Sequence, residues 1–163
     1  MKASMFNKKG FTLIELLIVV LLIGVLSGIA LSVINPRGIR AKSRDGQRIG
    51  DLKTIQVALE TYYSDKRKYP EQVTISFALI DDSQNGLSEL VTGNYINLLP
   101  ADPLGGGLPS DIGSVTCDGQ EISSYGYYYK RLSSSEYKLL AIMEIITSGS
   151  DETSYCEIVE NPL

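Results

Sequence analysis

One long apolar run dominates the pattern of hydrophobic and polar positions along the chain. It covers residues 11–34 and contains a single charged residue, Glu15. A helix of this length would extend about 36 Å at roughly 1.5 Å per residue, and the hydrocarbon core of a bilayer is about 30 Å thick. The pattern therefore predicts a helix over residues 11–34 that is long enough to span a membrane.

Two common targeting segments are alternative interpretations of this run. A secretory signal peptide would fit the basic residues that precede it, but its apolar region is usually about 7–15 residues long and ends in a small-residue cleavage site. The run exceeds that length and has no such site. A plain signal anchor would leave Glu15 without a partner, at a cost on the order of 2–3 kcal/mol. A cut between Gly10 and Phe11 would create an α-amino group one turn away, and pairing with it, in the same or a neighbouring copy, would offset this cost.

A second helical pattern follows the apolar run. Pro36 predicts a kink or a local loosening of the helix. Apolar residues then recur at steps of three and four, which is the spacing of one helical face. These residues are Ile49, Leu52, Ile55, Leu59 and Tyr62. We therefore expect an amphipathic continuation over residues 35–65.

The remaining residues, 66–163, are enough for one modest core. A short helix is expected at residues 87–91. Residues 125–129 and 137–142 flank a serine-rich turn and predict a hairpin, to which residues 155–159 could add an edge strand. Packing of this hairpin against the apolar stripe of the helix gives an α+β head.

Composition excludes several kinds of chemistry. The chain has no histidine and only two cysteines, so histidine-dependent nucleophile pairs, histidine metal ligands and four-thiolate zinc sites are ruled out. Gly105–Gly107 lies between prolines rather than between a strand and a helix, which argues against a phosphate-binding loop. We therefore expect no enzyme and no organic cofactor.

Charge is divided unevenly along the chain. Residues 1–53 carry nine Lys and Arg against three Asp and Glu, whereas residues 54–163 carry six against sixteen. This division predicts two environments, or head-to-tail association between copies. The basic cluster at residues 37–48 has three possible interpretations: a flank facing water or lipid headgroups, a contact with the acidic heads of other subunits, or a contact with DNA phosphates.

Residues 8–16, with the sequence KKGFTLIEL, resemble the class III signal of type IV pilins and type II secretion pseudopilins. In that family a short basic leader ends in Gly and is followed by Phe-Thr-Leu-Ile-Glu-Leu and an apolar helix. Tyr69-Pro70, Tyr95-Ile96 and the segment 99–103, LPADP, extend the resemblance more loosely. The resemblance implies a pilin-like α+β fold, in which one long amino-terminal helix packs its second half against a small antiparallel sheet.

The resemblance also implies a function. Residues 1–10 would be a leader removed by a prepilin peptidase between Gly10 and Phe11, Phe11 would be N-methylated, and Glu15 would dock each subunit onto the amino terminus of its neighbour. The implied product is the structural subunit of a type IV pilus or a type II secretion pseudopilus. The alternative is a minor subunit at the tip, whose head binds a surface ligand or DNA.

Localisation and partners follow from the same resemblance. The subunit would first be a single-pass protein of the inner membrane and then part of an extracytoplasmic filament, although a count of flanking cations alone would place its carboxy-terminal side in the cytoplasm. The expected partners are the peptidase and methylase, other copies and other pilins, the assembly platform of the inner membrane, and membrane lipid. Nucleic acid is not an expected partner of such a structural subunit.

Two further sites are candidates. Cys117 and Cys156 both follow the apolar run, and in an oxidising compartment we expect them to form a disulfide; two free buried thiols are the alternative. Asp102, Asp111 and Asp118, with neighbouring carbonyl groups, could form an oxygen cage for calcium. The resemblance favours this site, because major pseudopilins hold calcium in their carboxy-terminal loops, and solvated loop acids are the alternative.

Overall fold

The computed structural model describes residues 10–33, 36–72, 76–80, 87–145 and 155–161. The chain divides into two compact units, Met1–Arg37 and Gly38–Leu163. We describe each unit by itself.

The first unit contains one helix, α1 (Leu13–Val33). Thr12 precedes it, and its Oγ1 accepts a hydrogen bond of 3.3 Å from the backbone N–H of Glu15, as a residue that caps a helix does. The predicted helix is confirmed to within two residues at its start. Among the described residues, no helix is long and apolar enough to cross a membrane.

The second helix, α2 (Pro36–Lys66), confirms the predicted amphipathic segment. Pro36 stands at its first position, where the missing N–H removes no helical hydrogen bond. The predicted kink falls partly on residues 34–35, which lie outside the described residues. The helix ends where Arg67 takes a positive φ of 56° and donates its N–H to the carbonyl of Tyr63 at 2.8 Å.

The predicted apolar stripe of α2 is wrong at its first member. Ile49 is 38 % exposed, whereas Arg48 is completely buried. Arg48 lies four residues before Leu52 and so shares its face. The other four members are buried as predicted.

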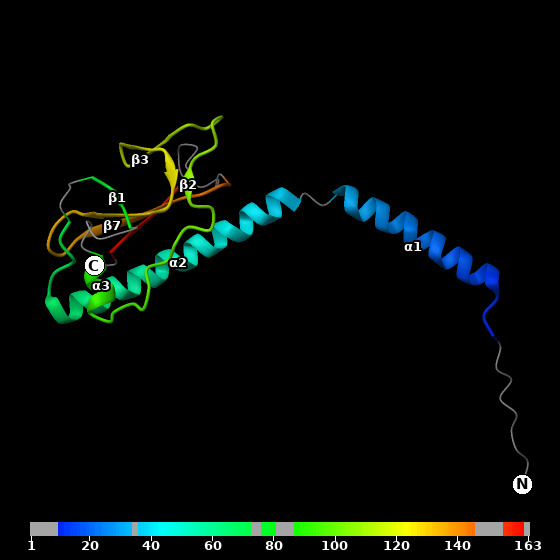
Figure 1. The fold of residues 1–163 in the computed structure, drawn as a ribbon, viewed down its shortest axis with the longest axis horizontal. Helices are drawn as coiled ribbons and strands as arrows, with labels where there is room; N and C mark the ends of the chain where they lie inside the picture. The colour runs from blue at the N-terminus through cyan, green and yellow to red at the C-terminus, as the bar shows by residue number, and fades with distance from the viewer. Residues whose placement is uncertain (1–9, 34–35, 73–75, 81–86, 146–154, 162–163) are drawn as a thin grey trace, which may run out of the picture. The chain divides into compact units, whose positions relative to one another are not determined.

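A four-stranded antiparallel sheet packs against α2 (Figure 1). Its order is β1-β6-β7-β8. The strands are β1 (Ala78–Leu79), β6 (Tyr127–Arg131), β7 (Tyr137–Ile142) and β8 (Cys156–Glu160). The hairpin of β6 and β7 confirms the prediction, with Tyr129 opposite Leu139, and the predicted edge strand is β8, with Ile158 opposite Leu140.

Shorter elements complete the head. The predicted short helix is α3 (Ser88–Thr92). Two small ladders were not predicted: β2 (Gly106–Gly107) pairs with β5 (Ser124–Tyr125), and β3 (Val115–Cys117) pairs with β4 (Gln120–Ile122).

The central hairpin of the main sheet, β6 and β7, is largely buried on both faces. Tyr127, Tyr129 and Leu139 pack with α2 in one apolar cluster, and Tyr128 and Leu140 pack with Ile122 in another. Neighbouring residues of a strand point to opposite faces. Two-sided burial therefore explains why the hairpin strands are apolar or aromatic at successive positions, without the usual alternation.

Candidate functional site

The segment around the predicted cleavage position is accessible. Gly10 and Phe11 precede the first residue of α1, and the Phe11 side chain is 84 % exposed. Glu15 lies in the first helical turn and is exposed, where a carboxylate also interacts favourably with the helix dipole. The peptide bond between Gly10 and Phe11 thus lies outside regular structure, four residues from the Glu15 carboxylate.

The large apolar side chains in the described part of α1 are exposed. From Leu13 to Ile29, its large hydrophobic residues are 47–82 % exposed. A continuous apolar surface of this extent marks a site of contact with lipid or protein. The described part of α1 therefore presents an apolar surface that is suited to contact with lipid or protein.

In the second unit, the buried guanidinium of Arg48 on α2 contacts several segments of the head. The Arg48 Nε and Nη2 atoms donate to the two carboxylate oxygens of Asp102 at 2.7 and 2.9 Å. Its Nη1 donates to Asp45 at 2.7 Å and to Glu144 at 2.9 Å. The Tyr125 ring lies 4.8 Å from the guanidinium carbon. Three segments far apart in sequence therefore meet at one side chain.

The surrounding carboxylates are also satisfied by other donors. Arg44 donates to Glu144 at 2.6 Å. The carboxylate of Asp45 accepts the backbone N–H groups of Glu144 and Ile145 at 2.9 and 3.0 Å. Oδ1 of Asp102 accepts the N–H of Leu104 at 2.9 Å. We call Arg44, Asp45, Arg48, Asp102 and Glu144 the Arg48 cluster.

The pKa shifts of Arg48, Asp102 and Glu144 all favour the charged forms of these groups. Burial acts to lower the pKa of Arg48, but hydrogen bonds to Asp102 and Glu144 outweigh it and raise that pKa. For Asp102, burial acts to raise the pKa, and the hydrogen bonds from Arg48 reverse the direction. The hydrogen bond from Arg44 is the largest influence that lowers the pKa of Glu144.

The three carboxylates predicted to hold calcium do not form one site. Both oxygens of Asp102 bind Arg48, and Asp118 accepts hydrogen bonds from Lys130 at 3.3 Å and Lys138 at 3.2 Å. Asp111 is exposed. Within the described ranges, no group of three acidic or cysteine side chains is arranged to hold a metal ion. The donor set does not fit calcium, because cationic side chains already occupy two of its three members.

The two cysteines lie next to each other in the head. The structure joins Cys117 and Cys156 by a disulfide, with 6.0 Å between their Cα atoms, a usual separation for such a bond. The bond connects β3 with β8 across 39 positions of sequence.

Tyrosine hydroxyls attach the head to α2, a feature that the apolar pattern did not reveal. Tyr127 donates to Asp51 at 2.5 Å, and Tyr137 donates to Glu60 at 2.9 Å. Tyr62 donates in turn to Glu89 of α3, and burial raises the pKa of Tyr62 to about 12. Acidic residues on α2 combined with a tyrosine-rich hairpin are the sequence signal from which these bonds could have been inferred.

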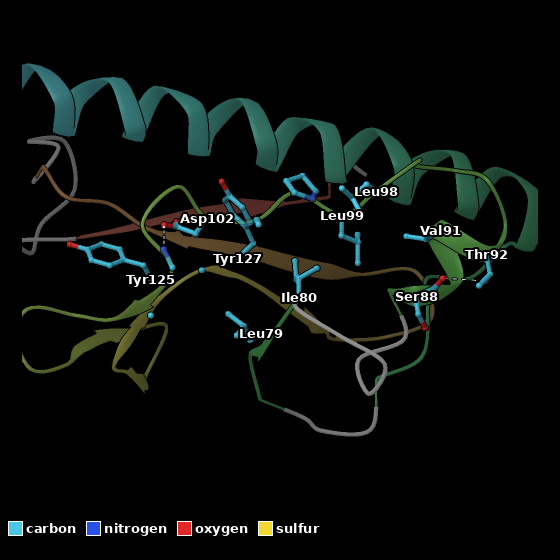
Figure 2. Close-up of a pocket in the computed structure, with 15 residues that line it drawn as sticks. Leu79, Ile80, Ser88, Val91, Thr92, Leu98, Leu99, Asp102, Tyr125 and Tyr127 are labelled. Carbon is cyan, nitrogen blue, oxygen red and sulfur yellow. Dashed lines mark hydrogen bonds between the residues drawn. The ribbon is translucent and has the colours of Figure 1, made fainter.

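A groove of about 530 Å³ lies between the segment 98–106 and the strands β1, β5 and β6. Figure 2 shows Leu79 and Ile80 on one side of it and Leu98 and Leu99 on the other. Two of its polar members are already engaged: Asp102 with Arg48, and the Tyr127 hydroxyl with Asp51. The groove offers an apolar lining without a convergent set of reactive groups.

Two family models match the chain, one over the first unit and one over the second. Residues 5–31 match the prokaryotic N-terminal methylation motif. Residues 38–130 match the family of type II secretion system (T2SS) protein G. The chain belongs to the protein G family of type II secretion.

Relatives of this family cover most of the chain. The chain is 32 % identical over 137 residues to the type II secretion system core protein G of Pseudomonas aeruginosa. The aligned region is 71 % of this chain and 87 % of that protein. The chain is 30 % identical over 139 residues to the core protein G of Vibrio cholerae, covering 72 % and 86 %. The type IV major pilin PilA of Myxococcus xanthus is 38 % identical over 73 residues, which are 44 % of this chain and 32 % of the pilin. No solved structure matches the chain.

Membership of the protein G family confirms the resemblance noted in the sequence. The chain is a pseudopilin-type structural subunit with an amino-terminal methylation motif, and it is not an enzyme. The α+β arrangement, with a long amino-terminal helical region followed by small antiparallel sheets, is confirmed as well.

Proposed function

We propose that this chain is the major subunit of a type II secretion pseudopilus and that it polymerises through α1. The observation that carries this proposal is the exposed apolar surface of α1, which directly follows an accessible Gly10–Phe11 bond. Such a surface is suited first to lipid and then to the apolar helices of other copies. Movement from one environment to the other keeps it out of water at each stage.

Maturation would prepare the subunit for this transfer. A prepilin peptidase removes residues 1–10, and methylation follows at Phe11. The new amino group then lies one helical turn from Glu15, or close to the Glu15 of an adjacent copy. An ion pair between these groups offsets the cost of burying Glu15 among apolar helices.

The four parts of the chain would then have separate roles. Residues 1–10 are the leader, residues 11–34 anchor the precursor in the inner membrane, residues 35–65 join this anchor to the head, and residues 66–163 form the head in the periplasm. An inner-membrane platform and the other pseudopilins are the assembly partners. The disulfide between Cys117 and Cys156 agrees with an oxidising compartment.

The proposal is tested in cells that carry the matching secretion genes. We expect Gly10→Val to prevent removal of the leader and Glu15→Ala to permit removal but abolish filaments. The matched controls are Ser4→Ala in the leader and Glu157→Ala in the head. Immunoblots report processing, and electron microscopy of sheared fractions reports filaments and the abundance of the subunit in them. Normal filaments from Glu15→Ala, or a subunit present only in trace amounts in wild-type filaments, would refute the proposal.

A further inference from the structure

The first two turns of α2 carry three exposed cations. Arg37, Arg40 and Lys42 are all exposed, and no ion pair involves them within the part of the chain that the structure describes. Arg44 and Arg48, which belong to the same basic stretch of sequence, are engaged in the Arg48 cluster. We call Arg37, Arg40 and Lys42 the collar.

The collar surrounds α2 and is not confined to one face. Successive helical residues turn by about 100°, so the three side chains leave the helix in directions roughly 60°, 140° and 160° apart. A protein partner that docks on one side of α2 would meet only part of this set. A layer that surrounds the helix on all sides at this height would contact all three side chains.

The height of the collar along the helix matches one such layer. Five residue steps separate Arg37 from Lys42, which corresponds to about 7.5 Å of helix. The headgroup region of a bilayer is about 5–8 Å thick on each side of the hydrocarbon core. The collar and the headgroup layer therefore have about the same height.

We propose that the collar binds anionic lipid headgroups in the membrane-held precursor. This inference rests on the proposed function, which places α1 in the bilayer. The long side chains of arginine and lysine can reach phosphate oxygens while their stems cover apolar surface. The contact would hold α2 upright at the membrane surface, and it would have to break when the subunit enters the filament.

The test uses the full chain, one copy per lipid nanodisc, with a fluorophore on Ser43→Cys introduced after the native disulfide has formed. Ser43 is exposed and adjoins Lys42. Quenching by neutral acrylamide is compared between discs of phosphatidylcholine and discs that also contain phosphatidylglycerol. At low salt, three cations at about 1 kcal/mol each favour the docked position by about 150-fold. We therefore expect protection of the probe only with phosphatidylglycerol, and loss of protection at high salt.

A triple variant provides the decisive comparison. R37Q/R40Q/K42Q should lose the protection, whereas K53Q/K66Q, which removes two exposed cations further along α2, should keep it. Equal quenching in both lipids would overturn the proposal. So would protection that appears only with several copies per disc, which would indicate a protein contact. A chain that alkaline carbonate extracts from the discs would instead refute the membrane stage of the proposed function.

Discussion

Replacement of Arg48 by methionine should destabilise the head more than any surface substitution. Methionine fills a similar volume but leaves three carboxylates without their shared cation. Breaking a buried ion pair by removal of one partner costs about 3–5 kcal/mol. The unit that contains the head has about 126 residues, so its unfolding entropy is roughly 0.26 kcal/mol/K and the melting temperature should fall by roughly 11–19 °C.

Thermal unfolding of the full chain in detergent, followed by near-ultraviolet circular dichroism of its tyrosines, measures this effect. Lys53→Met removes an exposed cation from the same helix and should change stability by at most about 0.5 kcal/mol. The double variant R48M/D102L removes one of the abandoned carboxylates as well. We expect its loss in free energy of unfolding to be smaller, by about 0.5–3 kcal/mol, than the sum of the losses of the two single variants. A fall of less than about 4 °C for Arg48→Met would refute the reasoning, because it would mean that water solvates these carboxylates.

Three further outcomes follow from the head. The pKa values of Asp102 and Glu144 are lowered in the folded state, so these carboxylates stabilise the fold above their ordinary pKa values near 4, and this contribution is lost as the pH falls below them. In urea titrations, the free energy of unfolding should therefore fall more steeply with acid for the wild type than for Arg48→Met. Reduction of the disulfide should lower the free energy of unfolding by about 3–4 kcal/mol, and intact-mass measurement showing two free thiols before reduction would contradict the bond. Calcium should leave the melting temperature unchanged, since Asp102 and Asp118 already bind cationic side chains; a stabilisation near 2.7 kcal/mol at about 100 times a dissociation constant would reveal a site.

Local pattern was sufficient for the elements whose cause is local. The two helices and the hairpin of β6 and β7 follow from periodicity and from a turn, and they appear close to the predicted bounds. The motif KKGFTLIEL was sufficient for the broad class of type IV pilins and pseudopilins, because its information lies within nine consecutive residues. The protein G family follows from the match over residues 38–130.

The Arg48 cluster could not be predicted in the same way. Its cation and two of its carboxylates are 54 and 96 residues apart in sequence, and no spacing rule connects them. In the sequence, Arg48 is one of several cations in a basic stretch. Only the fold places Asp102 and Glu144 beside it. The same cause applies to Asp102, which the sequence offered as a calcium ligand and which the fold pairs with the buried Arg48.

The position of the disulfide has a consequence for a filament under tension. The bond between Cys117 and Cys156 encloses β4 to β7 in a covalent ring, and α1 and α2 lie outside that ring in sequence. Between α2 and the ring, the covalent path runs through residues 67–116, and direct contacts such as those of Arg48 with Glu144 and of Asp51 with Tyr127 provide a shorter, non-covalent path. Force applied along the helices would load these direct contacts first. At high force, the contacts between α2 and the head would break before the strands within the ring separate.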